Sequence, residues 1–92
     1  MSVVIVGGND RMICQYKTIC KEYKCKAKIF TQMPNDFKAR IGSPDLMVLF
    51  TNTVSHKMVL RATQEAVRTN IKIARSHSSS GSALKGILKE YC

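Results

Sequence analysis

The sequence predicts an α/β domain built on a four-stranded parallel sheet with helices on both faces. Two patterns lead to this prediction. Short apolar runs of strand length alternate four times with longer segments in which apolar residues recur at helical spacing. The run at 46–50, Leu-Met-Val-Leu-Phe, is apolar throughout, as expected for a strand buried on both faces of a parallel sheet. With right-handed crossovers, the expected strand order is 2-1-3-4.

The first half of the chain supplies two strands and two helices. Residues 3–6 form the first strand, which ends in the glycine turn at 7–10, where Asn9 or Asp10 can cap the next helix. Apolar side chains mark one face of residues 12–23 without a gap, which predicts a helix. Residues 27–30 form a second strand, and their flanking lysines are typical of a sheet edge. A short helix over 36–41 follows.

The second half repeats the alternation. The central strand at 46–50 is followed by a helix that runs to about Thr69, with Thr53 or Asn52 as the expected N-cap. Residues 71–74 form the fourth strand. A serine-rich loop follows, and the apolar spacing of the residues behind it predicts a last helix that docks on the sheet. All of residues 1–92 are therefore expected to form a single domain.

The charge balance points to an anionic partner. Fifteen Lys and Arg against six Asp and Glu give a net charge of +9. The basic residues are spread along the chain, and Tyr16 and Tyr23 lie on the apolar stripe of the first helix, which argues against a base-stacking surface. Nucleic acid is therefore a possible but not a favoured partner. The chain has no apolar run of membrane-spanning length and no recognisable signal peptide, so a cytoplasmic protein without a membrane partner is expected.

The four cysteines fit no zinc or redox spacing. Reduced thiols are therefore expected. Cys20 falls on the apolar stripe of the first helix and is interpreted as a packing residue, whereas Cys14 and Cys92 are expected on the solvent side.

Three segments resemble a known family. They are Val-Gly-Gly at 6–8, Pro-Asp-Leu-Met-Val-Leu-Phe-Thr-Asn-Thr-Val-Ser-His at 44–56, and Ile-Lys-Ile-Ala-Arg-Ser-His-Ser-Ser-Ser at 71–80. Together they resemble a bacterial family of compact Rossmann-like domains that is known only as a domain of unknown function, and the Val-Ser-His step is the most specific part. The resemblance implies a Rossmann-like or flavodoxin-like fold in a bacterial cytoplasmic protein, and it implies haem as a candidate ligand.

The predicted strand order places the candidate site. The order reverses between strands one and three, so residues 7–11 and 52–58 are expected to face each other across the ligand crevice of an open α/β sheet. His56 falls in the first turn of its helix, where the helix dipole disfavours protonation and keeps a ring nitrogen available as a metal ligand. We therefore expect a non-enzymatic ligand-binding module, with haem as the specific ligand and His56 as its axial and metal ligand.

Other side chains are expected to contact the porphyrin ring and its propionates. Met12, Met33 and Met58 are expected to form a pliable apolar wall for the porphyrin, close to Tyr16. Arg11, Lys57 and Arg75 are the expected partners of the propionates. The expected ligand-binding residues are His56, Gly7, Gly8, Asn9, Arg11, Met12, Ser55, Lys57, Met58, Arg75, Ser78 and Ser79. Because a domain of this size can enclose only part of a porphyrin, we expect a homodimer or a larger homo-oligomer with the ligand near the interface.

Two alternatives remain open from the residues alone. A small phosphate-bearing metabolite could bind the N–H groups of Gly7 and Gly8 and the serine loop, helped by Arg75 and Lys85. A basic nucleic-acid-binding or protein-interaction module is the other. Each feature also has a plain structural interpretation: glycines that the turn requires, serines that cap a helix, methionines that pack in the core, and a surface histidine.

Enzyme classes find little support in the sequence. It contains neither the Gly-x-Gly-x-x-Gly fingerprint nor the Gly-Lys-Ser of a P-loop, so NAD and ATP are not leading ligands. It has no nucleophile elbow, and the carboxylates have local explanations in caps and turns. Phe50-Thr51-Asn52 stands where a response-regulator receiver has its phosphoacceptor aspartate. We therefore expect a protein that binds its ligand without chemical turnover.

Overall fold

The four strands pair in parallel in the order β2-β1-β3-β4, which confirms the predicted topology. The computed structural model describes residues 1–91. The strands are β1 (Ser2–Val6), β2 (Lys26–Phe30), β3 (Leu46–Phe50) and β4 (Lys72–Ser76). The two central strands, β1 and β3, are buried and almost wholly apolar, whereas the two edge strands alternate exposed basic residues with half-buried or buried ones.

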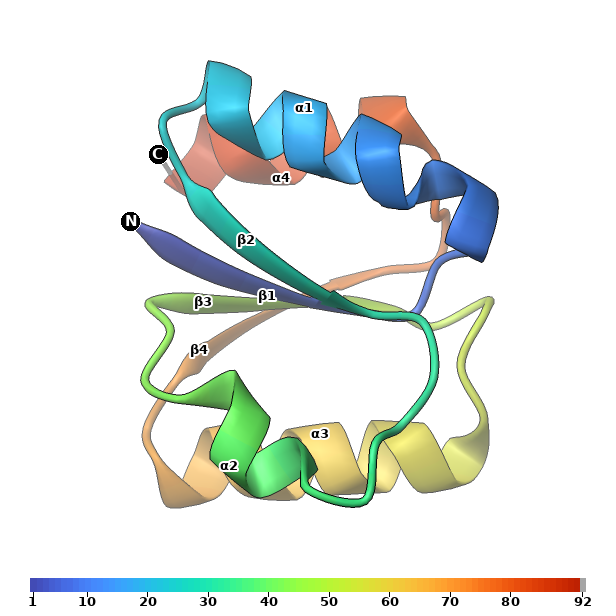
Figure 1. The fold of residues 1–92 in the computed structure, drawn as a ribbon, viewed down its shortest axis with the longest axis vertical. Helices are drawn as coiled ribbons and strands as arrows, with labels where there is room; N and C mark the ends of the chain where they lie inside the picture. Colours follow the sequence, from blue (N-terminus) through green and yellow to red (C-terminus); the bar gives the residue numbers. More distant parts are fainter. Residues whose placement is uncertain (92) are drawn as a thin grey trace.

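The helices cover both faces of the sheet, also as predicted (Figure 1). They are a short 3₁₀ turn η1 (Asp10–Met12), α1 (Ile13–Glu22), α2 (Phe37–Ile41), α3 (His56–Arg68) and α4 (Gly81–Tyr91). Helices α1 and α4 lie on one face, and α2 and α3 lie on the other. None of the helices within residues 1–91 has the length and apolar character needed to cross a membrane.

Each face of the sheet has its own core because neighbouring strand residues point to opposite sides. Ile5 packs with Tyr16, Phe50 and Leu84 under α1 and α4. Val4 and Val6 belong to the second cluster, under α2 and α3, together with Phe37, Met47 and Ala62. Burying one large apolar side chain of this kind contributes roughly 1.5–3 kcal/mol, so both clusters stabilise the fold.

The two helical layers differ in how closely they pack. Helices α1 and α4 contact each other directly above the sheet. Within residues 1–91, α2 and α3 have at most slight contact. The α1/α4 face is thus closed by its helices, and the α2/α3 face is not.

Several predicted boundaries need correction. The N-cap of α3 is Ser55, whose hydroxyl accepts the N–H of Met58 at 3.2 Å, and not Thr53 or Asn52. Thr53 cannot serve as the cap because its hydroxyl is engaged elsewhere: it accepts the N–H of Gly8 and donates to the carbonyl of Phe50. The fourth strand runs Lys72–Ser76 instead of 71–74, so it reaches further toward the serine loop than its apolar residues indicate.

The cysteines lie largely as expected. Cys14 is exposed and Cys20 is fully buried, which confirms both interpretations. Cys25 is also buried, at the start of β2. The expectation for Cys92 falls outside the described residues.

Candidate ligand-binding site

Three turns meet at the carboxyl edge of the sheet. The N–H of Gly8 donates to the hydroxyl of Thr53 at 2.6 Å, which joins the glycine turn to the turn before α3. The N–H of Thr51 donates to the carbonyl of Ser76 at 2.8 Å, and the Tyr16 hydroxyl donates to the carbonyl of Ser79 at 2.6 Å. The glycine turn, the turn at 51–55 and the serine loop are thus tied into one rim, where open α/β sheets place their ligands.

The protein's own side chains fill the space between these turns. An added Cβ would lie 2.7 Å from Cγ1 of Val54 at Gly7, and 2.6 Å from the Tyr16 ring at Gly8. Both glycines have positive φ angles, +103° and +83°, that other residues rarely adopt. Their N–H groups already donate, from Gly7 to the carbonyl of Phe30 and from Gly8 to Thr53. The turn therefore needs its glycines for backbone shape and close approach, and neither glycine N–H is open to an anion.

Hydroxyl groups of the serine loop also make hydrogen bonds within the loop and to the start of α4. Ser80 caps α4, because its hydroxyl accepts the N–H of Ala83 at 3.1 Å. The hydroxyl of Ser78 donates to the Ser80 hydroxyl at 3.1 Å and accepts the Ser80 N–H, while the Ser76 hydroxyl donates to the carbonyl of Ser78 at 2.7 Å. A relay of three serines accounts for more of the loop than a single cap does, and it leaves few donors for a phosphate.

Tyr16 closes the crevice. Its ring is fully buried, lies 5.4 Å from the Phe50 ring, and covers Gly8. Burial raises the pKa of the Tyr16 hydroxyl above its ordinary value, so the group remains a neutral hydrogen-bond donor at physiological pH. Tyr16 is therefore a structural link between the glycine turn and the serine loop.

The expected wall of three methionines is wrong as a single surface. Met12 packs against the cluster under α1 and α4, whereas Met33 and Met58 pack against the cluster under α2 and α3. The sheet lies between the two sets, because the loops after β1 and β2 leave it toward opposite faces (Figure 1). Only Met33 and Met58 can contact one ligand together.

The other basic and polar candidates are also divided. Arg11 and Arg75 are exposed, the first in η1 on the α1 side and the second on the edge strand β4. The Asn9 side chain caps η1 by accepting the N–H of Arg11 at 2.9 Å. Among the twelve predicted residues, Asn9 thus has a local structural role, and Arg11 and Arg75 do not join the third cation, Lys57, on one surface.

Ser55, Lys57 and Met58 do come together, in a groove of about 690 Å³ between the loop after β2 and the first turns of α3. The sequence reasoning missed most of the remaining lining. Those residues are Thr31, Gln32, Asn35, Leu60, Arg61 and Gln64, together with Met33, which was expected in the apolar wall. Lys57, Arg61 and Gln64 stand at i, i+4 and i+7, so their helical spacing was the signal that could have found this surface.

The two histidines lie outside the lining of this groove. His56 is the first residue of α3, exposed, between the groove residues Ser55 and Lys57. His77 is exposed in the loop after β4. Within residues 1–91, no three His, Cys, Asp or Glu side chains gather in a way that could hold a metal ion alone. A haem iron needs only one or two protein ligands, so this requirement does not apply to it.

The strand order, the crossovers and the glycine turn define the class of this protein: a Rossmann-like α/β domain. The chain belongs to the family described as "Uncharacterized protein conserved in bacteria (DUF2325)", which matches residues 2–91. This finding confirms the bacterial family of unknown function that the sequence motifs resemble. Among curated proteins, none is significantly similar to the chain.

Two solved structures are similar in fold. One is a de novo designed Rossmann fold protein, with a TM-score of 0.65 and 16 % identity over 97 % of this chain and 94 % of that one. The other is a de novo designed Rossmann 2x2 fold protein solved by NMR, with a TM-score of 0.65 and 15 % identity over 99 % of this chain and 86 % of that one. At these identities the likeness concerns the fold alone.

Proposed function

We propose that this protein is a non-enzymatic ligand-binding module and that the groove at the start of α3 holds an anionic ligand with a large apolar face. Haem is the specific candidate. One observation carries the proposal: the groove joins two thioether side chains, Met33 and Met58, to two cations, Lys57 and Arg61. These are the two kinds of group that an apolar ring with carboxylate substituents needs.

The lining fits such a ligand in size and charge. Its volume of about 690 Å³ lies within the range of about 300–1,000 Å³ that is usual for small-molecule sites. Leu60 adds apolar surface beside the two methionines, and the positive end of the α3 dipole also favours negative charge. Besides Met58 and Leu60, α3 contributes Lys57, Arg61 and Gln64 to the groove. Of these three, Lys57 and Arg61 are suited to pair with propionates.

His56 is the proposed axial ligand of the iron. It begins α3 and lies in the sequence between two residues of the groove lining, Ser55 and Lys57. Because His56 is exposed and the groove is a surface feature of a small domain, we propose that a second copy of the chain covers part of the ligand. A homodimer or a larger homo-oligomer in the cytoplasm is therefore part of the proposal.

Titration of the purified protein with haem tests this proposal. We expect saturable binding with a shifted Soret band, and His56→Ala should change that band by removing the axial ligand, whereas His77→Ala should leave it unchanged. The variant Lys57→Ala/Arg61→Ala should bind haem about tenfold more weakly, through the loss of two ion pairs of roughly 0.2–1 kcal/mol each. The matched control is Lys85→Ala/Lys89→Ala on α4, with the same change in net charge. Absence of saturable binding, or equal weakening in both double variants, contradicts the proposal.

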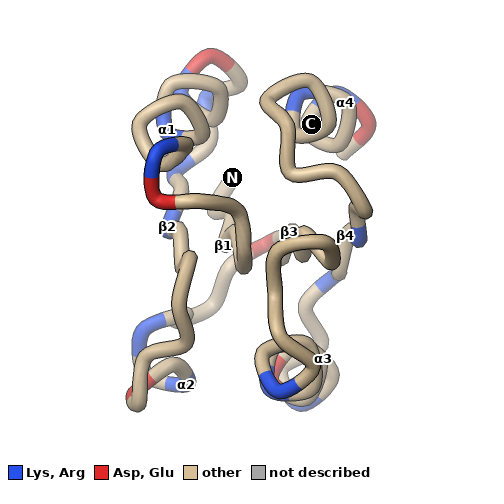
Figure 2. Tube along the Cα trace, turned by 90° about the vertical axis from the view of Figure 1, so that its right-hand side faces the viewer, with Lys and Arg blue, Asp and Glu red and all other residues tan. Residues whose placement is uncertain are grey.

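The other two hypotheses have weaker support. A phosphate-bearing metabolite at the glycine turn finds the N–H groups of Gly7 and Gly8 already engaged. For nucleic acid, the basic residues are distributed over several elements instead of forming one stripe (Figure 2). A nucleic-acid site would also show affinity that falls steeply with salt, which gives a direct test.

A further inference from the structure

The outer edge of β2 is open to another strand. Within the described chain β2 pairs only with β1, so one of its sides carries unpaired backbone groups. The carbonyl of Phe30 faces β1, because it accepts the N–H of Gly7 at 2.8 Å. Backbone groups alternate in direction along a strand, so the N–H and C=O groups of Ala27 and Ile29 point outward.

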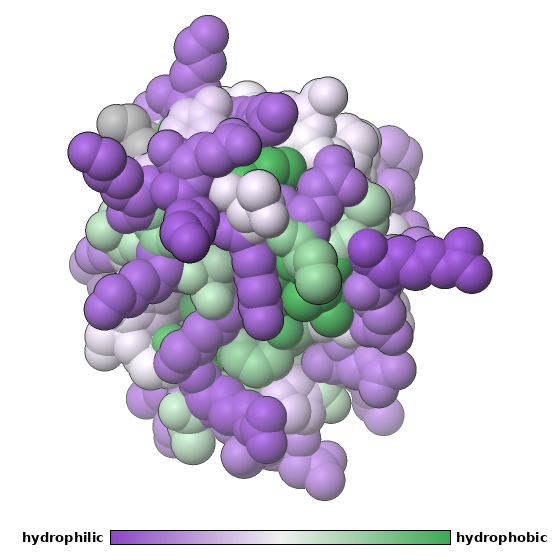
Figure 3. All heavy atoms as spheres, turned by 45° about the horizontal axis from the view of Figure 1, so that its top comes forward, coloured by the Kyte–Doolittle hydropathy of each residue, from purple (hydrophilic) through white to green (hydrophobic). Residues whose placement is uncertain are grey.

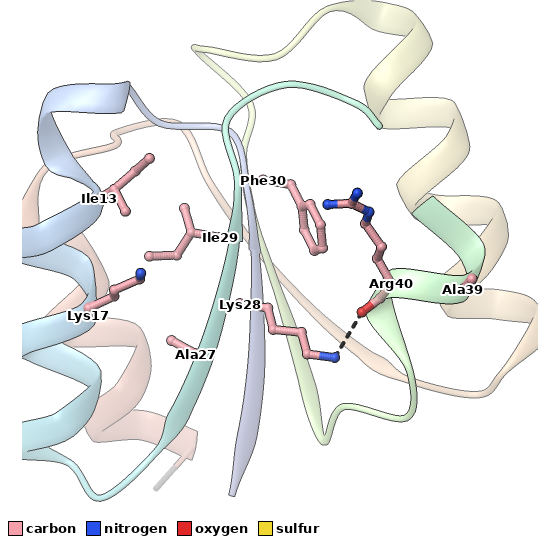
Figure 4. Close-up of a pocket in the computed structure, with 8 residues that line it drawn as sticks. All are labelled: Ile13, Lys17, Ala27, Lys28, Ile29, Phe30, Ala39 and Arg40. Carbon is pink, nitrogen blue, oxygen red and sulfur yellow. Dashed lines mark hydrogen bonds between the residues drawn. The ribbon is translucent and has the colours of Figure 1, made fainter. Parts of the chain in front are cut away.

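A groove of about 650 Å³ follows this edge (Figure 4). Ile13 and Lys17 of α1 border it on one side of the strand, and Ala39 and Arg40 of α2 border it on the other. The groove shares no lining residue with the groove at the start of α3. Figure 3, which turns the α1 side and the β2 edge toward the viewer, shows apolar patches framed by projecting hydrophilic side chains. An added strand would thus have a helix on either side of it.

The charges beside this edge are mostly positive. Lys17, Lys28 and Arg40 line the groove. Arg40 pairs with Asp36 at 2.7 Å, and the Lys28 ammonium donates to the carbonyl of Arg40 at 2.9 Å. Within residues 1–91 Lys17 is not part of either ion pair, so its charge is available to a partner. Together with the net charge of +9, this arrangement favours an acidic occupant.

The same charges disfavour a second copy of this chain. Both edge strands, Lys26–Phe30 and Lys72–Ser76, carry two basic residues each, so pairing two copies edge to edge would bring like charges together. Lysines on a sheet edge commonly prevent such self-association. The basic edge of β2 disfavours pairing with the same edge of another copy, but it can pair with a strand that carries negative charge.

We propose that the β2 edge binds an acidic, extended segment of a partner protein as an added strand. The outward backbone groups of Ala27 and Ile29 supply main-chain hydrogen bonds, the interaction that strand addition relies on. Side chains on one face of the added strand meet Ile13 and Lys17, and those on the other meet Arg40. The segment recognised therefore combines short apolar side chains with Glu or Asp.

A labelled peptide tests the proposal. The probe is a blocked ten-residue peptide of alternating Glu and Val, with binding to the full chain followed by fluorescence anisotropy. One control peptide alternates Lys with Val. The other is the Glu-Val peptide methylated at every backbone nitrogen, which keeps the charge and the side chains but has no backbone N–H to donate. We expect saturable binding of the Glu-Val peptide only. Amide exchange by NMR should show new protection at Ala27 and Ile29.

Three variants locate the site. Ala27→Pro removes an outward N–H without breaking the pairing with β1, so it should abolish peptide binding while circular dichroism and thermal unfolding confirm that the protein remains folded. Lys17→Glu should weaken binding about fivefold through the loss of an exposed ion pair and the new repulsion. Lys72→Glu on the β4 edge makes the same change in net charge and should leave the affinity within about twofold. Haem binding in the groove at α3 should be unchanged in Ala27→Pro.

Several results would overturn the proposal. One is equal binding of the N-methylated peptide or of single-stranded oligouridylate, because the surface would then respond to charge alone. Another is equal weakening by Lys17→Glu and Lys72→Glu. Protection of the Ala27 and Ile29 amides in the concentrated protein without peptide would instead assign the edge to a second copy. Absence of binding to the Glu-Val peptide would also refute it, whatever the outcome of the haem titration.

Discussion

The two faces of the sheet differ in whether their helices meet. On one face α1, with 10 residues, and α4, with 11, contact each other and seal the core beneath them. On the other face α3 has 13 residues but α2 has only 5, and the connection over 31–45 leaves a groove beside α3. In this fold, a crossover helix too short to reach its neighbour creates the binding surface, while the crevice at the strand switch point is filled by Tyr16 and Val54.

The largest expected loss of stability comes from truncating a core residue of the closed face, and we compare it with the truncation of a groove residue of the open face. Leu84 is fully buried, so Leu84→Ala should lower the free energy of unfolding by about 2–5 kcal/mol. Met58 is only partly buried, and Met58→Ala should cost less than about 1.5 kcal/mol while weakening haem binding. Urea unfolding measures both, and equal losses would show that the two faces are equally well packed.

Glycine substitutions probe the sealed crevice. Gly8→Ala forces a Cβ to within 2.6 Å of the Tyr16 ring at a φ of +83°, so we expect a loss of about 1–3 kcal/mol. Gly86→Ala is the control: at this position in α4 no atom of the described residues outside its own helix turn lies within 4 Å of an added Cβ. Helix propensity should then stabilise the protein by about 0.5–1 kcal/mol. Thermal unfolding measures the stability of both variants. An unchanged stability of Gly8→Ala would refute a packed crevice.

Tyr16→Phe removes the hydroxyl that bonds the Ser79 carbonyl, and it should cost about 1–2 kcal/mol near neutral pH. The cost should shrink at alkaline pH. Burial raises the pKa of Tyr16 in the folded state, so above about pH 10 the unfolded state loses this proton first and the folded protein is destabilised. The Tyr16→Phe variant has no hydroxyl at this position, so it does not undergo this alkaline destabilisation.

Urea unfolding of both proteins at about pH 8 and about pH 11 measures this difference. Below the unfolded pKa, the stabilisation from Tyr16 should be fully present, and it should disappear as the pH rises through the folded pKa. A difference between the two proteins that is independent of pH, or that grows with pH, would contradict the buried position of the hydroxyl.

The smallest effect concerns the cap of α3. Ser55→Ala should cost about 0.5–1 kcal/mol, because the N–H of Met58 loses its acceptor but lies at an open groove where water can replace it. Thr53→Val removes two hydrogen bonds, because it takes away the acceptor of the Gly8 N–H and the donor to the Phe50 carbonyl, and it should cost more. Chemical unfolding that ranks Thr53→Val below Ser55→Ala would reverse our assignment of the cap.

Most of the fold could be predicted from the sequence. The apolar run at 46–50 identified a strand buried on both faces, and the lysines around 26–28 identified an edge. The alternation of strands with helices and right-handed crossovers led to the strand order that the structure shows. The N-cap of α3 was misplaced because several residues before the helix have a suitable side chain. Local pattern alone does not reveal that the Thr53 hydroxyl is used by Gly8, 45 positions away in the sequence.

The site was less predictable, for a physical reason. Spacing showed that Met12, Met33 and Met58 follow strands or begin helices, but the face of the sheet to which each loop turns depends on the crossovers. Lys57 and Met58 were identified because they begin α3. Arg61 and Asn35 were missed because the groove exists only through the shortness of α2 and the docking of its loop, which are tertiary features.

The most direct test uses the methyl groups of the five methionines, labelled with ¹³C and observed by NMR while paramagnetic haem is added. Binding in the groove at α3 predicts that the signals of Met33 and Met58 broaden first and that the Met12 signal, on the other face of the sheet, stays sharp. Broadening of Met12 ahead of Met33 and Met58, or no selective broadening at all, would contradict the proposed site.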